Sequence, residues 1–244
     1  MTSQKTVHSI AADSLSTQYG PPIHARAVTA LTVTTGALMA FYLLARPYGD
    51  AGGAETAAAA DAFASPMWIW SHLAGATALV LLAALWALAS TGAIRWAALA
   101  GVAMVLPYYG AETFALHAIG IRALSDPAAL ALVPAIRNDP AALPLFGLGL
   151  IALAVAGIAA ALQKMRTQND GPGRGRLAWA LLPLAVVAAL FLPQFFLPAP
   201  GRITYGLLFA AAAAVAAYAI RGGAGPSQRM PSGPSRSAAG GSTG

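Results

Sequence analysis

The stretch MWIWSHLAGATALVLLAALWALA (Met67–Ala89) decides the class of fold, because it is apolar throughout and holds one histidine but no Asp, Glu, Lys or Arg. A helix of about 20 apolar residues crosses the ~30 Å hydrocarbon core of a bilayer. Five further stretches of the same character lie at Ala27–Ala45, Ile94–Ala118, Ala141–Leu162, Leu177–Leu197 and Ile203–Ile220. We therefore predict an all-α fold, a polytopic integral membrane helical bundle with six transmembrane helices.

The overall composition excludes most soluble classes of protein. Charged residues make up 9% of the 244 residues and hydrophobic residues 58%, whereas an ordinary soluble domain holds about 25% charged residues. The net charge of +6 comes from basic residues dispersed between apolar blocks, and a nucleic-acid binder would gather them into a stripe. The absence of cysteine excludes disulfides and thiolate metal sites. We expect the lipid bilayer as a partner and no nucleic acid.

The distribution of Lys and Arg predicts the orientation, because cytoplasmic loops carry an excess of these residues. Ten of the 14 fall on the side that holds both termini, which predicts N-in/C-in. Residues 1–26 are then a cytoplasmic N-terminal tail, 27–220 the six-helix transmembrane domain, and 221–244 a disordered cytoplasmic tail rich in Gly, Ser and Pro. Abundant alanine, and arginine in excess of lysine, are typical of a GC-rich bacterial genome, so we expect the bacterial plasma membrane.

Three residue pairs predict where helices begin, because each has an N-cap side chain followed by proline at the first helical position. They are Ser65–Pro66, Asp126–Pro127 and Asp139–Pro140. The first and third would begin the second and fourth spans, and the second a short interfacial helix over Pro127–Val133. We also expect the alanine-rich loop Asp50–Ala64 to be partly helical.

Small residues recur four apart in two of the spans. They are Ala152, Ala156 and Ala160 in the fourth span, and Gly206, Ala210 and Ala214 in the sixth. Such stripes allow helix backbones to approach closely in lipid. Packing inside one bundle is the favoured interpretation, and an oligomer interface is the alternative.

Ionisable residues within a span are candidates for function, since insertion scales assign them a cost of about 2.5–3.5 kcal/mol. Glu112 and His72 are the clearest cases. At ~1.5 Å per helical residue, both lie roughly 7–9 Å below the outer boundary, on consecutive antiparallel helices. We expect a Glu112–His72 pair, in which each charge offsets the desolvation of the other.

Further polar and helix-breaking residues cluster in the same outer half. Tyr108 lies four residues before Glu112 on the same helical face. Pro107 removes a backbone hydrogen bond and predicts a kink. Gln194 lies near the outer end of the fifth span, where Pro193 beside it predicts an irregular helix end. The predicted ligand-binding or proton-relay site is His72, Tyr108, Glu112 and Gln194.

Each of these residues also has a simpler interpretation. Glu112 in a neutral form would only fix helix packing. His72 would reach lipid headgroups or water from its place near the interface. His117, at the membrane boundary, is an interfacial residue and not a ligand in this interpretation.

The site predicts a multi-pass protein that binds or transports a small molecule, ion or proton through its extracytoplasmic half. The alternative is a non-catalytic subunit or scaffold that associates with itself or with another membrane subunit. Six helices with His72 and His117 superficially resemble cytochrome b561-type proteins, a resemblance that implies haem and electron transfer. Those proteins carry paired histidines on both sides, whereas both histidines here are outer. The redox interpretation is less favoured, and we expect no cofactor and no metal.

Enzyme activity is left uncertain, with the balance against it. The chain holds no G-x-S-x-G, H-E-x-x-H or G-x-x-x-x-G-K motif. No span carries a pair of acidic residues. One carboxylate beside one histidine supports proton transfer but indicates no substrate.

Overall fold

The computed structural model describes residues 23–167 and 175–222, and within them the regular elements are helices, with no strand. The predicted all-α bundle is therefore confirmed. Five helical segments are long and apolar enough to cross a membrane. They are α2 (Ile23–Ala45), α4 (Pro66–Ala89), the continuous run Ala93–Ala123, α8 (Ala142–Thr167) and α10 (Ala199–Gly222).

The predicted span Leu177–Leu197 is irregular at its outer end, as Pro193 predicts. The helix α9 (Gly175–Ala189) is followed by a turn and by a short 3₁₀ helix, η4 (Pro193–Phe196). Pro193 has no N–H to donate and its ring clashes with the carbonyl four residues earlier, which ends an α-helix at that point. The apolar helix is therefore shorter than predicted, and the chain is bent where it enters α10.

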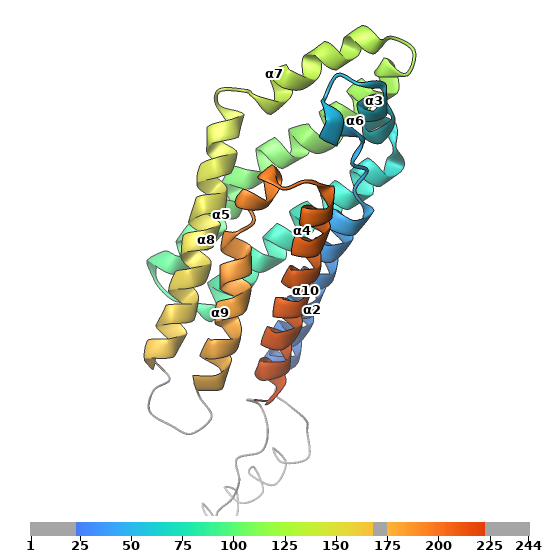
Figure 1. The fold of residues 1–244 in the computed structure, drawn as a ribbon. Helices are drawn as coiled ribbons and strands as arrows, with labels where there is room; N and C mark the ends of the chain where they lie inside the picture. The colour runs from blue at the N-terminus through green and yellow to red at the C-terminus, as the bar shows by residue number, and fades with distance from the viewer. Residues whose placement is uncertain (1–22, 168–174, 223–244) are drawn as a thin grey trace, which may run out of the picture.

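The helices pack as neighbours in a bundle, with α2 beside α10, α5 (Ala93–Gly110) beside α8, and α8 beside α9. In Figure 1 the described chain begins and ends at the same end of the bundle. The helix α2 begins at Ile23, four residues before the predicted start. The predicted tails lie almost wholly outside the described residues, so the disorder of the C-terminal tail stays a prediction.

Glycines allow α2 and α10 to approach closely. A Cβ atom on Gly36 would lie 2.6 Å from that of Ala213, and one on Gly206 would lie 3.0 Å from that of Leu43. In the other predicted stripe, Ala156 and Ala160 are buried inside the bundle. These contacts favour packing within one bundle over an oligomer interface.

The third span is longer than predicted and contains an irregular turn. The helix α5 runs through Pro107, and the π-helical turn η2 (Ala111–Ala115) follows it before α6 (Leu116–Ala123). Because of α6, the helix continues five residues past the predicted end at Ala118. A π-helical turn inside an α-helix is rare and is often found at functional sites.

A second small apolar core lies at one end of the bundle, in a region that we call the cap. The cap consists of η1 (Gly49–Gly52), α3 (Ala57–Ala64), α6, η3 (Pro127–Leu132) and α7 (Val133–Arg137). Its core joins Phe63 of α3 to Leu116, Leu130 and Val133. Figure 1 shows α3, α6 and α7 together at this end. The prediction of partial helix over Asp50–Ala64 is confirmed.

Helices begin at or just after all three predicted positions, and two of them have the predicted side-chain cap. The Ser65 hydroxyl accepts the N–H of Met67 at 3.2 Å, and one oxygen of Asp139 accepts two backbone N–H groups at 2.8 and 2.9 Å. Asp126 makes no such cap, because its carboxylate pairs with Arg122. A short helix does begin at Pro127, as predicted, but its first part is the 3₁₀ helix η3, and it continues past Val133 through α7.

Candidate functional site

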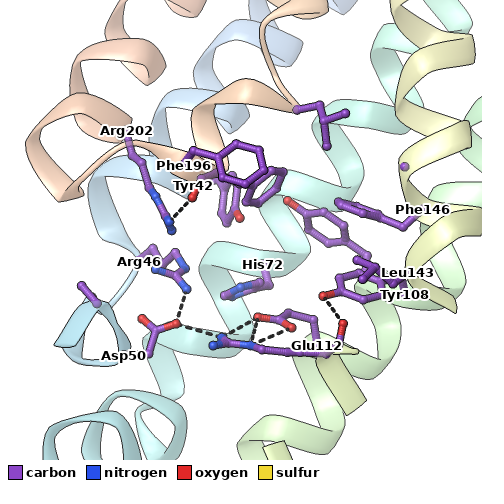
Figure 2. Close-up of a pocket in the computed structure, with 16 residues that line it drawn as sticks. Tyr42, Arg46, Asp50, His72, Tyr108, Glu112, Leu143, Phe146, Phe196 and Arg202 are labelled. Atoms are coloured by element: carbon purple, nitrogen blue, oxygen red, sulfur yellow. Dashed lines mark hydrogen bonds and ion pairs between the residues drawn. The ribbon is translucent and has the colours of Figure 1, made fainter. Parts of the chain in front are cut away.

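A cavity of ≈ 380 Å³ lies where the bundle meets the cap (Figure 2). This volume is within the range of about 300–1,000 Å³ that is usual for small-molecule sites. Residues of α2, α4, α5, α8 and α10 all contribute to its walls. The polar lining residues are Tyr42, Arg46, Asp50, His72, Tyr108, Tyr109, Glu112, Arg137 and Arg202.

Four of the charged residues form one continuous network. Arg137 Nη2 lies 2.8 Å from Glu112 Oε1 and 2.8 Å from Asp50 Oδ2. Arg137 Nε also donates to both oxygens of Glu112, at 3.2 and 3.3 Å. Arg46 Nη2 donates to Asp50 Oδ2 at 2.7 Å. The network ties the end of α2 and the π turn to two elements of the cap.

The innermost pair of this network is charged although it is buried. The side chains of Arg46 and Asp50 are only 5% and 6% exposed. Burial raises the pKa of Asp50, but the charges of Arg46 and Arg137 outweigh it and hold that pKa below its ordinary value. Burial lowers the pKa of Arg46, and the carboxylate of Asp50 more than offsets this effect. Both groups are therefore ionised at neutral pH.

The π turn and its neighbours position Glu112 at the cavity. Glu112 is the second residue of the turn, and its backbone carbonyl accepts a hydrogen bond from Trp68 Nε1 at 3.1 Å. The Thr113 hydroxyl donates to the Tyr109 carbonyl at 2.6 Å. Trp68 also lies under the guanidinium of Arg46, 4.9 Å from the ring centroid. The same indole thus supports both the turn and the buried cation.

His72 lies in an aromatic setting on the cavity wall. Its ring centroid is 4.1 Å from that of Trp68 and 5.4 Å from that of Tyr42. His72 Nδ1 lies 2.7 Å from the Trp68 carbonyl. Since a carbonyl only accepts, Nδ1 carries the hydrogen, and a neutral ring then offers Nε2 as an acceptor. The residue is 1% exposed, so the interpretation that it reaches headgroups is wrong.

The structure brings together three of the four predicted site residues. His72, Tyr108 and Glu112 line the same cavity, but the expected partner of Glu112 is wrong, because its carboxylate binds Arg137 and not His72. Gln194 is 1% exposed in η4 and is not part of the lining. His117 Nδ1 bonds the carbonyl of Phe63 at 2.7 Å, which joins α6 to α3.

Four arginine and aspartate residues of the site were missed from the sequence. They are Arg46, Asp50, Arg137 and Arg202. The sequence did hold one signal, since Arg46 and Asp50 are four residues apart directly after the first span. In the sequence alone, these charges bear only on the orientation of the loops.

Aromatic side chains form a second wall, which we call the aromatic wall and which consists of Tyr108, Phe146, Phe195 and Phe196. The rings of Tyr108 and Phe146 are stacked with centroids 4.5 Å apart. Phe195 meets Phe146 edge to face at 5.7 Å. The Tyr108 hydroxyl donates to the Arg137 carbonyl at 3.3 Å, which links this wall to the ion network.

The arrangement can hold a small polar organic molecule, with guanidinium donors on one side and aromatic rings on the other. Among the residues that the structure describes, no three His, Asp or Glu side chains are grouped as metal ligands would be. Fold and site together define an all-helical protein with membrane-length apolar helices and a charged cavity at one end of the bundle. Comparison with protein-family models, with curated proteins and with solved structures finds no match for this chain.

Proposed function

We propose that this protein binds a small molecule in the cavity, as a ligand-binding protein or carrier of the bacterial plasma membrane. In this proposal six segments cross the membrane and both termini are cytoplasmic, so the cavity and the cap lie in the extracytoplasmic half. The ratio of ten to four basic residues supports this orientation.

The observation that carries the proposal is a buried ion network along the wall of a cavity of ligand size. Removing a charge from water costs several kcal/mol per ion even in real proteins, and apolar residues of similar volume often stabilise a fold as well or better. A bundle selected only for packing would therefore not need Arg46, Asp50, Glu112 and Arg137 around a cavity. Binding a polar ligand gives these charges a use.

The proposal assigns different tasks to the lining residues. Asp50 and Glu112 hold the guanidinium groups of Arg46 and Arg137 in place. His72 and Tyr108 add polar edges to a wall that is otherwise aromatic. The role of Glu112 is to position Arg137, which differs from the proton relay expected from the sequence.

Gly147 offers a direct test, because it lines the cavity and a Cβ atom there would meet nothing within 4 Å. The substitution Gly147→Leu should fill part of the cavity without a clash. Gly110 is a matched control, since its Cβ would also meet nothing within 4 Å and it is not a lining residue. Both glycines are in helices, so the effect on helix propensity is shared.

The measurement is the thermal unfolding midpoint of the purified full chain in detergent, with three aromatic probes of similar size and different charge. These are benzoate, benzyl alcohol and benzylammonium. At least one should raise the midpoint of wild type and of Gly110→Leu but not that of Gly147→Leu, because a ligand at 100 times its Kd stabilises by about 2.7 kcal/mol. If no probe shifts wild type, or if Gly147→Leu responds equally, the proposal is wrong.

A further inference from the structure

The charges around the cavity do not balance. The lining holds three guanidinium groups, those of Arg46, Arg137 and Arg202, and two carboxylates, those of Asp50 and Glu112. One formal positive charge is therefore in excess. The two carboxylates are bound to Arg46 and Arg137, so the excess charge belongs to Arg202.

Arg202 has only neutral partners among the described residues. Its Nε donates to the Leu197 carbonyl at 2.9 Å and its Nη2 to the Phe195 carbonyl. These bonds fix the guanidinium at the start of α10, and no carboxylate among the described residues forms an ion pair with it. In Figure 2 the group points into the cavity toward Arg46, and the two cations repel each other.

A second donor on the same side of the cavity is free. Arg46 Nη1 is buried and makes no hydrogen bond within the described part of the chain, although the side chain is only 5% exposed. A buried donor that lacks a partner destabilises the fold, and more so when it is charged. Asp50 Oδ1 is also unpaired, but that carboxylate already meets two guanidinium groups through Oδ2.

The aromatic wall begins where Arg202 is anchored, because the Phe195 carbonyl accepts its hydrogen bond. From there the rings of Phe195, Phe146 and Tyr108 follow one another at centroid distances of 5.7 and 4.5 Å. Rings in such a row offer faces and edges to a flat ligand. An anionic group at Arg202 would therefore have an aromatic surface directly beside it.

We infer that the ligand of this cavity is a flat organic monoanion, with a carboxylate between Arg202 and Arg46 and an unsaturated body against the aromatic wall. The inference rests on the proposed function and names its class of ligand. The guanidinium group matches a carboxylate because it presents paired N–H donors in a plane. One negative charge cancels the formal excess, whereas a cation would increase it.

The test is equilibrium dialysis of radiolabelled benzoate against the purified full chain in detergent. Arg202→Gln should weaken benzoate binding about tenfold or more, since a hydrogen bond to a charged group is lost. Arg202→Lys keeps the positive charge, so its affinity for benzoate should lie between that of Arg202→Gln and that of wild type. The control Arg122→Gln removes a cation that is not part of the cavity and should bind as wild type does.

The outcomes separate this inference from the proposed function. If benzylammonium or benzyl alcohol binds more tightly than benzoate, and Gly147→Leu abolishes that binding, the inference of an anionic ligand is wrong. The cavity then remains a binding site. Benzoate bound equally by wild type and by Arg202→Gln overturns the assigned carboxylate position. If none of the three probes binds, both proposals are wrong. Equal unfolding midpoints of Arg202→Gln and Arg202→Lys exclude misfolding as the cause of a difference between them.

Discussion

Arg137 is the link between the cap and the bundle, and its replacement by methionine is the most informative test of the ion network. The substitution keeps an unbranched apolar side chain and removes the guanidinium. It eliminates three hydrogen bonds to Glu112 and one to Asp50. Asp50 retains Arg46, whereas Glu112 has no other ion-pair partner among the described residues.

The expected loss follows from the burial of the two partners. Removing one member of a fully buried ion pair costs about 3–5 kcal/mol, because the other charge is left uncompensated. The side chains of Arg137 and Glu112 are 23% and 14% exposed, so water screens part of this interaction. We therefore expect Arg137→Met to lower the free energy of unfolding by about 2–3 kcal/mol.

A double variant separates the ion pair from other effects of the substitution. Replacing both partners by apolar residues is often close to neutral, so Arg137→Met with Glu112→Leu should be more stable than Arg137→Met alone. The coupling free energy from the full cycle should be at least about 1 kcal/mol. The measurement is unfolding in mixed detergent micelles, followed by circular dichroism.

The matched control is Arg122→Met, which removes another arginine of the cap. Arg122 pairs with Asp126 at 3.2 Å, but the two side chains are 69% and 45% exposed. An exposed pair of this kind contributes about 0–1 kcal/mol. The reasoning is refuted if Arg137→Met costs no more than Arg122→Met, or if the losses in the double variant simply add.

Three further predictions follow from other parts of the structure. Although burial raises the pKa of Asp50, two neighbouring arginines hold that pKa below its ordinary value of 3.8. The ionised carboxylate therefore stabilises the fold above pH 3.8, and this contribution should be lost as the pH falls further. The free energy of unfolding of Asp50→Asn should lack that decline. Gly36→Val should lower the free energy of unfolding by about 1–3 kcal/mol relative to Gly110→Val, because a Cβ at Gly36 would lie 2.6 Å from that of Ala213. Equal stability of the two variants in micelles would contradict the close contact of α2 and α10. The chain has no cysteine, so a single introduced cysteine reports its side of the membrane. A membrane-impermeant maleimide should label Ser125→Cys in intact cells, and Thr91→Cys only after permeabilisation. The reverse pattern would invert the proposed orientation.

The helices were predictable from the sequence because their cause is local. A run of apolar residues such as Met67–Ala89 is sufficient to specify a membrane-length helix. The starts at Ser65 and Asp139 were predictable for the same reason, since a cap depends on the next two or three residues. The irregular helix end at Pro193 was predictable as well, but the α-helix α9 already ends at Ala189, earlier than predicted.

The site was predictable only in part, because its contacts span long distances in the chain. The depth of a residue along a helix follows from the number of residues to the helix end. That count predicts similar depths in the membrane for His72 and Glu112, and both line the cavity. The partner of Glu112 comes from α7, 25 residues later, and Arg137 also reaches Asp50, 87 residues earlier. Those contacts exist because the cap folds over the bundle end, which no local pattern indicated.

The cavity is proposed to bind an organic anion between Arg202 and the aromatic wall. A crystal structure of the full chain with 4-iodobenzoate tests it most directly, because anomalous scattering locates the iodine without ambiguity. The carboxylate should lie at Arg202 and Arg46, with the iodine beside Phe146 and Phe195. Iodine only on the lipid-facing surface, or a carboxylate turned away from Arg202, would contradict it.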